Sequence, residues 1–337
     1  MKIKGIMSAF LFLITMNSCS GQVVTDKSNK ENMENTKEKN PLLCDIETGM
    51  CETGPETSEN KIDTRNEGTK PVRVVYFTDP ICSSCWGIEP QLRKLKLEYG
   101  YALNIEYRMG GLLPDWSYNS GGISKPSDVA HHWDEVSVYY DMPIDGDVWL
   151  EDPLNSSYPP SIAFKAAQMQ DETKAVKFLR ELRELLFLEK KNITKWEYVE
   201  QAAKKTGLDV ERLKTDYEGG QAEKLFKEDL QLAREMGVRG FPTIFFIDDK
   251  NAVERVYGSK PYPVYEGSVL KLFQGEKQEY GKEWSDLFSI YPTLTAKEFS
   301  VLSGASRENA EIQLEKLVTK GKLSKFTTKN GNLYKVQ

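Results

Sequence analysis

Histidine and cysteine are scarce in this chain of 337 residues, and it has no excess of positive charge. Its only two histidines, His131 and His132, are adjacent, which argues against a His-rich metal centre, so we expect no metal and no other cofactor. The formal net charge is −6, so the composition predicts no nucleic-acid partner. The apolar fraction of 39% is enough for a sizeable core, and the length suits roughly two domains.

Long apolar runs are also missing, and the run from Ile6 to Met16 is too short to span a bilayer as a helix. It follows two lysines and has the length of the apolar region of a signal peptide. The residues that come next, Ser18 and Cys19, resemble a bacterial lipoprotein box. This resemblance implies a signal peptide over residues 1–18, a lipid on Cys19, and a membrane-anchored location in the cell envelope, facing the periplasm or the exterior. The alternative is an ordinary cleaved signal peptide with an incidental cysteine.

The polar stretches divide the rest of the chain. Residues 19–41 are charged and lack apolar periodicity, which predicts a disordered tether. Residues 42–70 combine a short segment around Cys44 and Cys51 with a second polar linker. We expect a main domain over residues 71–281 and a small module over residues 290–337, which we call the C-terminal module.

The main domain begins with a pattern typical of an α/β fold. Val72–Thr78 is β-branched and apolar, as a buried strand is, and a helix is expected to begin near Cys82. A second strand over Leu103–Met109 completes a β-α-β unit with parallel strands. Residues from about 115 to 237 have mostly helical spacing, and strands resume at Thr243–Ile247. The order predicts an α/β sheet interrupted by a large helical insertion.

Cys82 and Cys85 form a C-x-x-C motif at the expected start of that first helix. Unpaired backbone N–H groups and the helix dipole at such a position stabilise a thiolate, so we expect Cys82 to be an exposed thiol with a lowered pKa. The thiolate is the attacking species in disulfide exchange, and Cys85 is close enough to resolve a mixed disulfide. The neighbours Ser83 and Ser84 add hydroxyl groups but no cation.

A second signal lies about 160 residues downstream, in Gly240-Phe241-Pro242-Thr243. A proline that enters a strand is unusual unless a special turn requires it. In thioredoxin-like folds a cis-proline at this point faces the C-x-x-C and binds an extended peptide. We therefore expect Pro242 to be cis and close to Cys82.

The segment Phe77-Thr78-Asp79-Pro80-Ile81-Cys82-Ser83-Ser84-Cys85-Trp86 resembles the active site of the DsbA family, within which two branches are most similar. One comprises FrnE-like disulfide isomerases, and the other comprises adaptors that present the regulator Spx to the ClpXP protease. Residues 155–167 resemble the insertion of both branches, and residues 237–243 match the cis-proline loop. The resemblance implies a thioredoxin-like fold, with Cys82 attacking, Cys85 resolving, and Trp86, Phe241 and Pro242 contacting substrate. Ser-Ser replaces the Pro-His of strongly oxidising members, which leaves the oxidising strength open.

Our leading interpretation is a protein thiol-disulfide oxidoreductase or isomerase that acts on exported proteins. Its expected partners are proteins with thiols or disulfides, an unidentified redox partner, and the membrane through the lipid. The rival interpretation is a non-catalytic adaptor of the same fold that binds a protein partner. An inert structural disulfide, or a zinc site that uses two or all four of the remaining cysteines, is a further alternative.

Cys44 and Cys51 form a second close pair, which we interpret as a second redox pair. Asp45, Glu47 and Glu52 surround it with negative charge, which disfavours a thiolate. The pair is therefore expected either to receive oxidising equivalents as a relay or to staple a short segment that has no core of its own.

The C-terminal module shows two short helices followed by a hairpin signal at Asn330-Gly331. Thr295-Ala296-Lys297-Glu298 is a capping box that opens the first helix. This order is typical of a winged-helix-like module, but the charges on its second helix are balanced. We expect a protein-contact or packing role and no nucleic acid.

Overall fold

The computed structural model describes residues 44–46, 48–52, 70–117 and 125–337, and the side chain of Cys44 is not among the described features. All of these residues belong to one unit, residues 38–337. The expected signal peptide, the lipidated Cys19, the tether and most of the linker lie outside the described residues, so these remain predictions.

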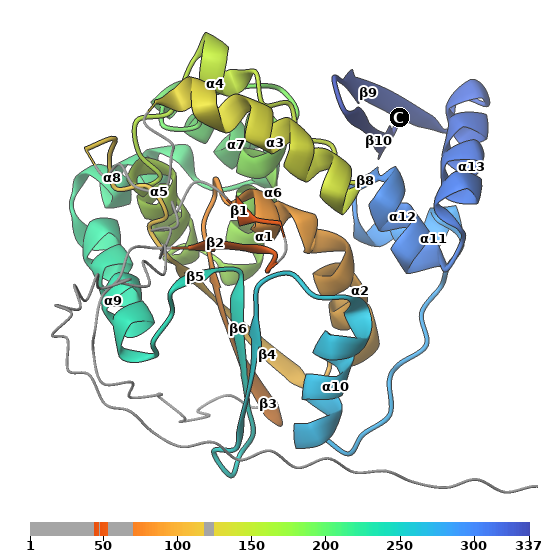
Figure 1. The fold of residues 1–337 in the computed structure, drawn as a ribbon, viewed down its shortest axis with the longest axis horizontal. Helices are drawn as coiled ribbons and strands as arrows, with labels where there is room; N and C mark the ends of the chain where they lie inside the picture. The colour runs from red at the N-terminus through yellow and green to blue at the C-terminus, as the bar shows by residue number, and fades with distance from the viewer. Residues whose placement is uncertain (1–43, 47, 53–69, 118–124) are drawn as a thin grey trace, which may run out of the picture. The chain divides into compact units, whose positions relative to one another are not determined.

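A four-stranded sheet in the order β4-β3-β6-β7 forms the centre of the main domain (Figure 1). Its first strand, β3, is buried along its whole length, as its β-branched and apolar sequence predicts. The pair β3–β4 is parallel, whereas β3–β6 and β6–β7 are antiparallel. The bounds are β3 (Val72–Thr78), α1 (Ser83–Gly87), α2 (Glu89–Tyr99), β4 (Leu103–Met109), β6 (Thr243–Ile247), β7 (Val253–Tyr257) and α10 (Tyr262–Leu272).

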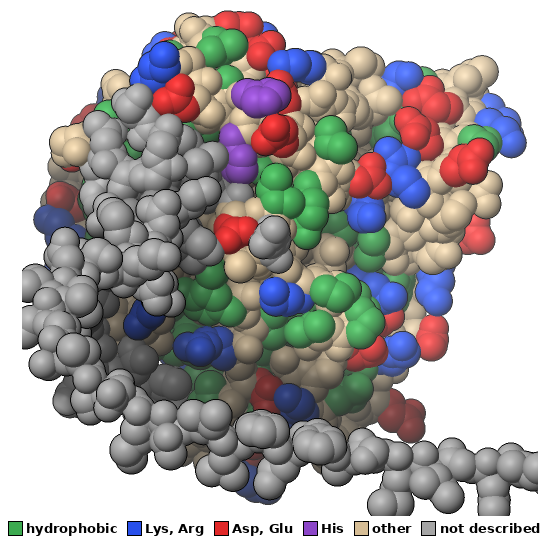
Figure 2. Space-filling view, in the orientation of Figure 1, with side chains coloured by type: hydrophobic (Ala, Val, Ile, Leu, Met, Phe, Trp, Pro, Cys, Tyr) green, Lys and Arg blue, Asp and Glu red, His purple; other side chains and the backbone are tan. Residues whose placement is uncertain are grey.

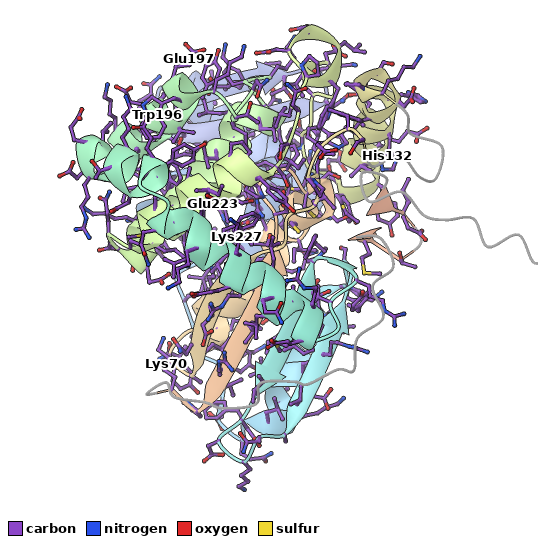
Figure 3. The ribbon with its side chains drawn as sticks, turned by 90° about the vertical axis from the view of Figure 1, so that its left-hand side faces the viewer. Lys70, His132, Trp196, Glu197, Glu223 and Lys227 are labelled. Carbon is purple, nitrogen blue, oxygen red and sulfur yellow. The ribbon has the colours of Figure 1, made fainter. Side chains whose placement is uncertain are left out.

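A block of seven described helices is inserted between β4 and β5 (Gly240–Phe241). They are α3 (Pro126–Tyr140), α4 (Val148–Glu151), α5 (Tyr158–Gln168), α6 (Glu172–Phe187), α7 (Trp196–Thr206), α8 (Val210–Glu218) and α9 (Gln221–Glu235). Figure 3 shows α9 crossing in front of the strands, with Glu223 and Lys227 next to each other on its outer surface. This block is the predicted helical insertion, and its apolar faces join the same core as the sheet.

The segment around the first cysteine pair folds as a hairpin of β1 (Cys44–Asp45) and β2 (Met50–Glu52). We call it the β1–β2 hairpin. Its second strand pairs with β5, so that β1, β2 and β5 form a separate three-stranded antiparallel sheet. In Figure 1 the hairpin lies beside α1, above β5.

The C-terminal elements share a second hydrophobic core that includes Phe299, Leu314 and Tyr334. They are α11 (Trp284–Ile290), β8 (Thr293–Thr295), α12 (Ala296–Ser303), α13 (Arg307–Thr319), β9 (Leu323–Thr328) and β10 (Gly331–Val336). The two helices, the hairpin and the capping box follow the sequence expectation, whereas α11 and β8 were not expected. The winged-helix interpretation of this order stays a prediction.

Acidic and basic side chains are interspersed over the face shown in Figure 2, which has no broad area of one sign among its coloured atoms. Within the described part of the chain, no helix combines the length and the apolar character that a membrane crossing needs.

Candidate functional site

The C-x-x-C lies where strand β3 gives way to α1. Cys82 is the N-cap of α1, and its sulfur accepts a hydrogen bond of 3.1 Å from the backbone N–H of Cys85. The Asp79 carboxylate shapes the preceding turn by accepting hydrogen bonds from the backbone N–H groups of Ile81 at 3.0 Å and Leu112 at 2.8 Å. The predicted helix start at Cys82 is confirmed.

Both thiols of this motif are free, and both are fully buried. Burial and the interaction with Cys85 raise the pKa of Cys82 well above its ordinary value, although the backbone hydrogen bond from Cys85 acts in the opposite direction. The expectation of an exposed Cys82 with a lowered pKa is therefore wrong. The reason is that the thiol is covered, as the hairpin contacts below show.

A buried cation beneath the motif was missed by the sequence analysis. Arg183, from α6, donates to the Thr78 hydroxyl at 2.6 Å and to the Asp79 carbonyl at 3.2 Å. It also forms a 2.8 Å ion pair with Glu89. Its charge favours the thiolate form of both cysteines, but it does not offset the burial of Cys82. Nothing in the local sequence of Arg183 separates it from the other charged residues of α6.

The β1–β2 hairpin covers Cys82 directly. Cys51 is the register partner of Phe241 in the β2–β5 pair, and the Cys82 thiol donates a hydrogen bond to the Cys51 sulfur at 3.5 Å. Cys51 is disulfide-bonded, and its partner is neither Cys82 nor Cys85 because both of these are free. Cys44 is the residue directly opposite Cys51 in the β1–β2 register. The structure thus brings the second cysteine pair to the C-x-x-C.

The cis-proline loop is present as predicted, because the Phe241–Pro242 peptide bond is cis. The Pro242 carbonyl accepts a hydrogen bond of 2.9 Å from the backbone N–H of Gly258. The Phe241 ring is buried against Gly110, where a Cβ atom would lie only 1.9 Å from it. The backbone of this loop, and not the Phe241 side chain, therefore faces the hairpin.

Trp86, for which the resemblance implies a contact with substrate, has a fully buried side chain. Its indole N–H donates to the Pro143 carbonyl at 3.0 Å, and its ring stacks on Phe187 with centroids 5.5 Å apart. The Arg180 guanidinium lies 4.3 Å from the ring centroid. Trp86 therefore joins the C-x-x-C helix to the helical insertion, and its contact with substrate stays a prediction without a structural contact to support it.

Helix α3 supplies a second contact that the sequence analysis missed. The Tyr140 hydroxyl donates to Ser84 at 3.0 Å, and its ring packs on Gly87, where a Cβ atom would lie 2.4 Å away. No group of three or more His, Cys, Asp or Glu side chains that could hold a metal occurs among the residues that the structure describes.

A C-x-x-C at a helix start, a cis-proline loop and a helical insertion in the sheet define a thioredoxin-fold protein of the DsbA type. The chain belongs to the Thioredoxin_5 family, whose model, described as Thioredoxin, matches residues 76–267.

Two curated relatives match far beyond that region. The chain is 37% identical to the ClpXP adapter protein SpxH of Halalkalibacterium halodurans over 304 residues, covering 88% of this chain and 98% of that protein. It is 32% identical to the ClpXP adapter protein SpxH of Bacillus subtilis, covering 79% of this chain and 89% of that protein. The resemblance to the DsbA family and its Spx-adaptor branch is thereby confirmed.

The chain is similar in structure to a solved protein from Nitrosomonas europaea, described as a candidate protein disulfide isomerase, with a TM-score of 0.53 between the two. That protein is 19% identical and covers 61% of this chain and 98% of its own, so it shows the fold alone. Our expectation that the chain is a thiol-disulfide oxidoreductase or isomerase is wrong, because the relatives that match most of its length are named adapters.

Proposed function

We propose that the chain is a non-catalytic adaptor that binds a protein partner and delivers it to the ClpXP protease. The observation that carries this proposal is the length of the likeness: SpxH of H. halodurans covers 88% of the chain, whereas the disulfide-isomerase fold covers 61%. The adapter relatives therefore match residues outside the part that the isomerase structure covers. A partner of the Spx type is the one that these names suggest.

The geometry around the C-x-x-C supports the adaptor over an enzyme that acts on other proteins. An enzyme of that kind needs a thiolate that reaches its substrate. Here Cys82 is fully buried, its pKa is raised, and its sulfur already contacts Cys51 of the same chain. The position that an incoming disulfide would take is thus occupied in this state.

The test is degradation of a purified Spx-type regulator by purified ClpXP, with and without this chain. We expect the chain to shorten the half-life of the regulator at least about tenfold, because tethering raises its effective concentration at the protease. A ClpXP substrate that the chain does not bind serves as the control and should be degraded at an unchanged rate. Absence of both binding and acceleration, or insulin reduction at the rate of a DsbA-type enzyme, would contradict the proposal.

The predicted location in the cell envelope is tested separately, because Cys19 lies outside the described residues. A lipidated chain that faces the exterior would not share a compartment with a cytosolic protease. Metabolic labelling with an alkyne fatty acid, compared with a Cys19→Ser variant, decides the point. Label that depends on Cys19 would support the envelope address and would rule out delivery to ClpXP, leaving only binding of an exported partner.

A further inference from the structure

The β1–β2 hairpin occupies a backbone edge that would otherwise be open. Strand β5 consists of Gly240–Phe241, and in its own small sheet it is paired with β2 alone. The pairing is antiparallel, with Cys51 opposite Phe241 and Glu52 opposite Gly240. An extended segment that adds to a sheet edge gains main-chain hydrogen bonds whatever its side chains are, so this edge is a general strand-binding site.

The turn of the hairpin fits closely against the end of β7. Gly49 has φ +68°, and a Cβ atom there would lie 2.7 Å from Ser259. A Cβ atom at Gly258 would lie 2.3 Å from the Thr48 carbonyl oxygen. The backbone N–H of Ser259 donates to the Gly49 carbonyl at 2.7 Å. The backbone of the hairpin turn therefore lies directly against the backbone of Gly258 and Ser259. A side chain at either glycine would prevent this close approach.

The hairpin also brings the sulfur of Cys51 into contact with the sulfur of Cys82. The Cys82 thiol lies 3.5 Å from the Cys51 sulfur, which is in a disulfide, and the backbone N–H of Cys85 donates a hydrogen bond of 3.1 Å to the Cys82 sulfur. A free thiol in contact with a disulfide sulfur is the arrangement that precedes thiol–disulfide exchange. Both sulfurs are buried, so a reductant in solution reaches this contact only when the hairpin opens locally.

We propose that the β1–β2 hairpin is an internal occupant of the β5 edge, and that its disulfide exchanges with the Cys82–Cys85 dithiol to release it. The exchange is confined to one chain and turns over no substrate. It concerns contacts within the chain and does not depend on the proposed adaptor function.

The exchange is balanced without any other reactant. The Cys82 thiolate attacks the Cys51 sulfur, a Cys51–Cys82 bond forms, and the bond from Cys51 to its disulfide partner breaks. The departing sulfur, which the sequence pairs with Cys44, takes the electron pair and the proton that Cys82 gave up. Cys85 then attacks Cys82 and frees Cys51 as a thiol. The hairpin disulfide is reduced by two electrons, and the Cys82–Cys85 dithiol is oxidised by the same two.

Release follows because the hairpin is too small to persist without its cross-link. An isolated two-stranded hairpin is marginal in water, and this one has strands of two and three residues. Once its disulfide is open, the hairpin has no covalent cross-link and is held by non-covalent contacts, among them the short pairing with β5, the contacts at Ser259 and the burial of Met50 and Cys51. Its departure exposes the β5 edge and the sulfur of Cys82, so an extended segment of another polypeptide can bind there.

The decisive experiment uses a Cys85→Ser variant of the full chain, in which the second step is blocked. After incubation at alkaline pH, non-reducing peptide mapping by mass spectrometry should find a Cys51–Cys82 disulfide in place of the original bond of Cys51. Wild type treated in the same way should show a Cys82–Cys85 disulfide and alkylated hairpin thiols. A Cys82→Ser variant is the control and should keep the original bond.

If the Cys85→Ser chain keeps Cys82 free under these conditions, the exchange is excluded. The alkylation rate of Cys82, compared between wild type and a chain without the hairpin cysteines, provides a second measurement that does not use the Cys85→Ser variant. We expect at least about a tenfold faster rate in a Cys44→Ser/Cys51→Ser chain, since local opening exposes a buried group in proportion to its population. An unchanged rate would overturn the release of the hairpin.

Discussion

The C-terminal module and the β1–β2 hairpin both pack on the main domain, but different forces hold them. The module is fixed by charges that are buried at the contact. Glu298 of α12 accepts two hydrogen bonds from Arg180 of α6, at 2.7 and 3.1 Å, and lies 3.3 Å from Arg93 of α2. The hairpin is held by backbone hydrogen bonds, two close glycine contacts and a sulfur contact.

This difference predicts which contact can open. Separation of the module would break the two charge-assisted hydrogen bonds between Arg180 and Glu298, each of which contributes about 1.5–3 kcal/mol. Separation of the hairpin exposes the side chains of Met50 and Cys51 and a few backbone groups, which water can satisfy at a net cost of about 1 kcal/mol for each hydrogen bond. We therefore expect the module to stay bound to the main domain and the hairpin to detach more easily.

The largest expected effect comes from Glu298→Gln. The change removes the buried carboxylate that Arg180 and Arg93 share and leaves them only Glu184 and Glu89, so we expect the free energy of unfolding to fall by about 3–5 kcal/mol. Chemical denaturation followed by circular dichroism measures it. Glu223→Gln is the matched control, since Glu223 forms an exposed 2.7 Å pair with Lys227 on α9 (Figure 3) and should cost less than about 1 kcal/mol. Equal losses in the two variants would contradict the fixed role of the module contact.

Two buried acids should respond to pH in opposite directions. Burial raises the pKa of Asp79 from 3.8 to about 6, so its contribution to stability is complete below the lower value and is lost as pH rises through the higher one. Burial alone would also raise the pKa of Glu298, but Arg180 and Arg93 hold it below its ordinary value. The contribution of Glu298 is therefore present above the ordinary pKa of a glutamate and is lost on acidification.

For Asp79 the size of the effect follows from the shift. The stability of wild type relative to an Asp79→Asn variant should fall by up to about 3 kcal/mol between pH 4 and pH 7, because one unit of pKa shift corresponds to about 1.4 kcal/mol. Denaturation curves at a series of pH values measure this difference. A relative stability that is flat or that rises over this range would show that Asp79 is ionised without penalty in the folded state.

A smaller effect is expected from Gly258→Ala, which targets the hairpin alone. The new Cβ atom would meet the Thr48 carbonyl, so the hairpin should detach more often. Gly304→Ala is the matched control, because Gly304 also has a positive φ but has nothing within 4 Å of the added atom. Both changes should cost about 1–2 kcal/mol of backbone strain. Only Gly258→Ala should speed alkylation of Cys82, by about tenfold for each 1.4 kcal/mol lost from the docking contact. Equal alkylation rates in the two variants would show that the close contact at Gly258 does not hold the hairpin in place.

The structural features that neighbouring residues determine could be predicted from the sequence. The β-α-β unit over Val72–Met109 follows from apolar runs and turn residues, and the cis-proline loop follows from a proline that enters a strand. The capping box of α12 was likewise predicted from four consecutive residues. In each of these features, neighbouring residues decide the local structure.

The contacts that bring distant segments together could not be predicted. The pairing of Cys51 with Phe241 joins positions far apart in the sequence, and a polar linker between them sets no distance. Arg183 lies next to the C-x-x-C because α6 brings it to Thr78 at the end of β3, and this placement depends on the whole insertion. The burial of Cys82 is a consequence of the first contact, so its pKa was predicted in the wrong direction.

Hydrogen exchange with mass spectrometry, on the intact chain before and after mild reduction of its disulfide, tests the difference between the two regions most directly. We expect Gly240–Phe241 and β2 to lose protection on reduction, while β8, β9 and β10 of the C-terminal module keep theirs. Unchanged protection at Gly240–Phe241, or an equal loss in both regions, would contradict it.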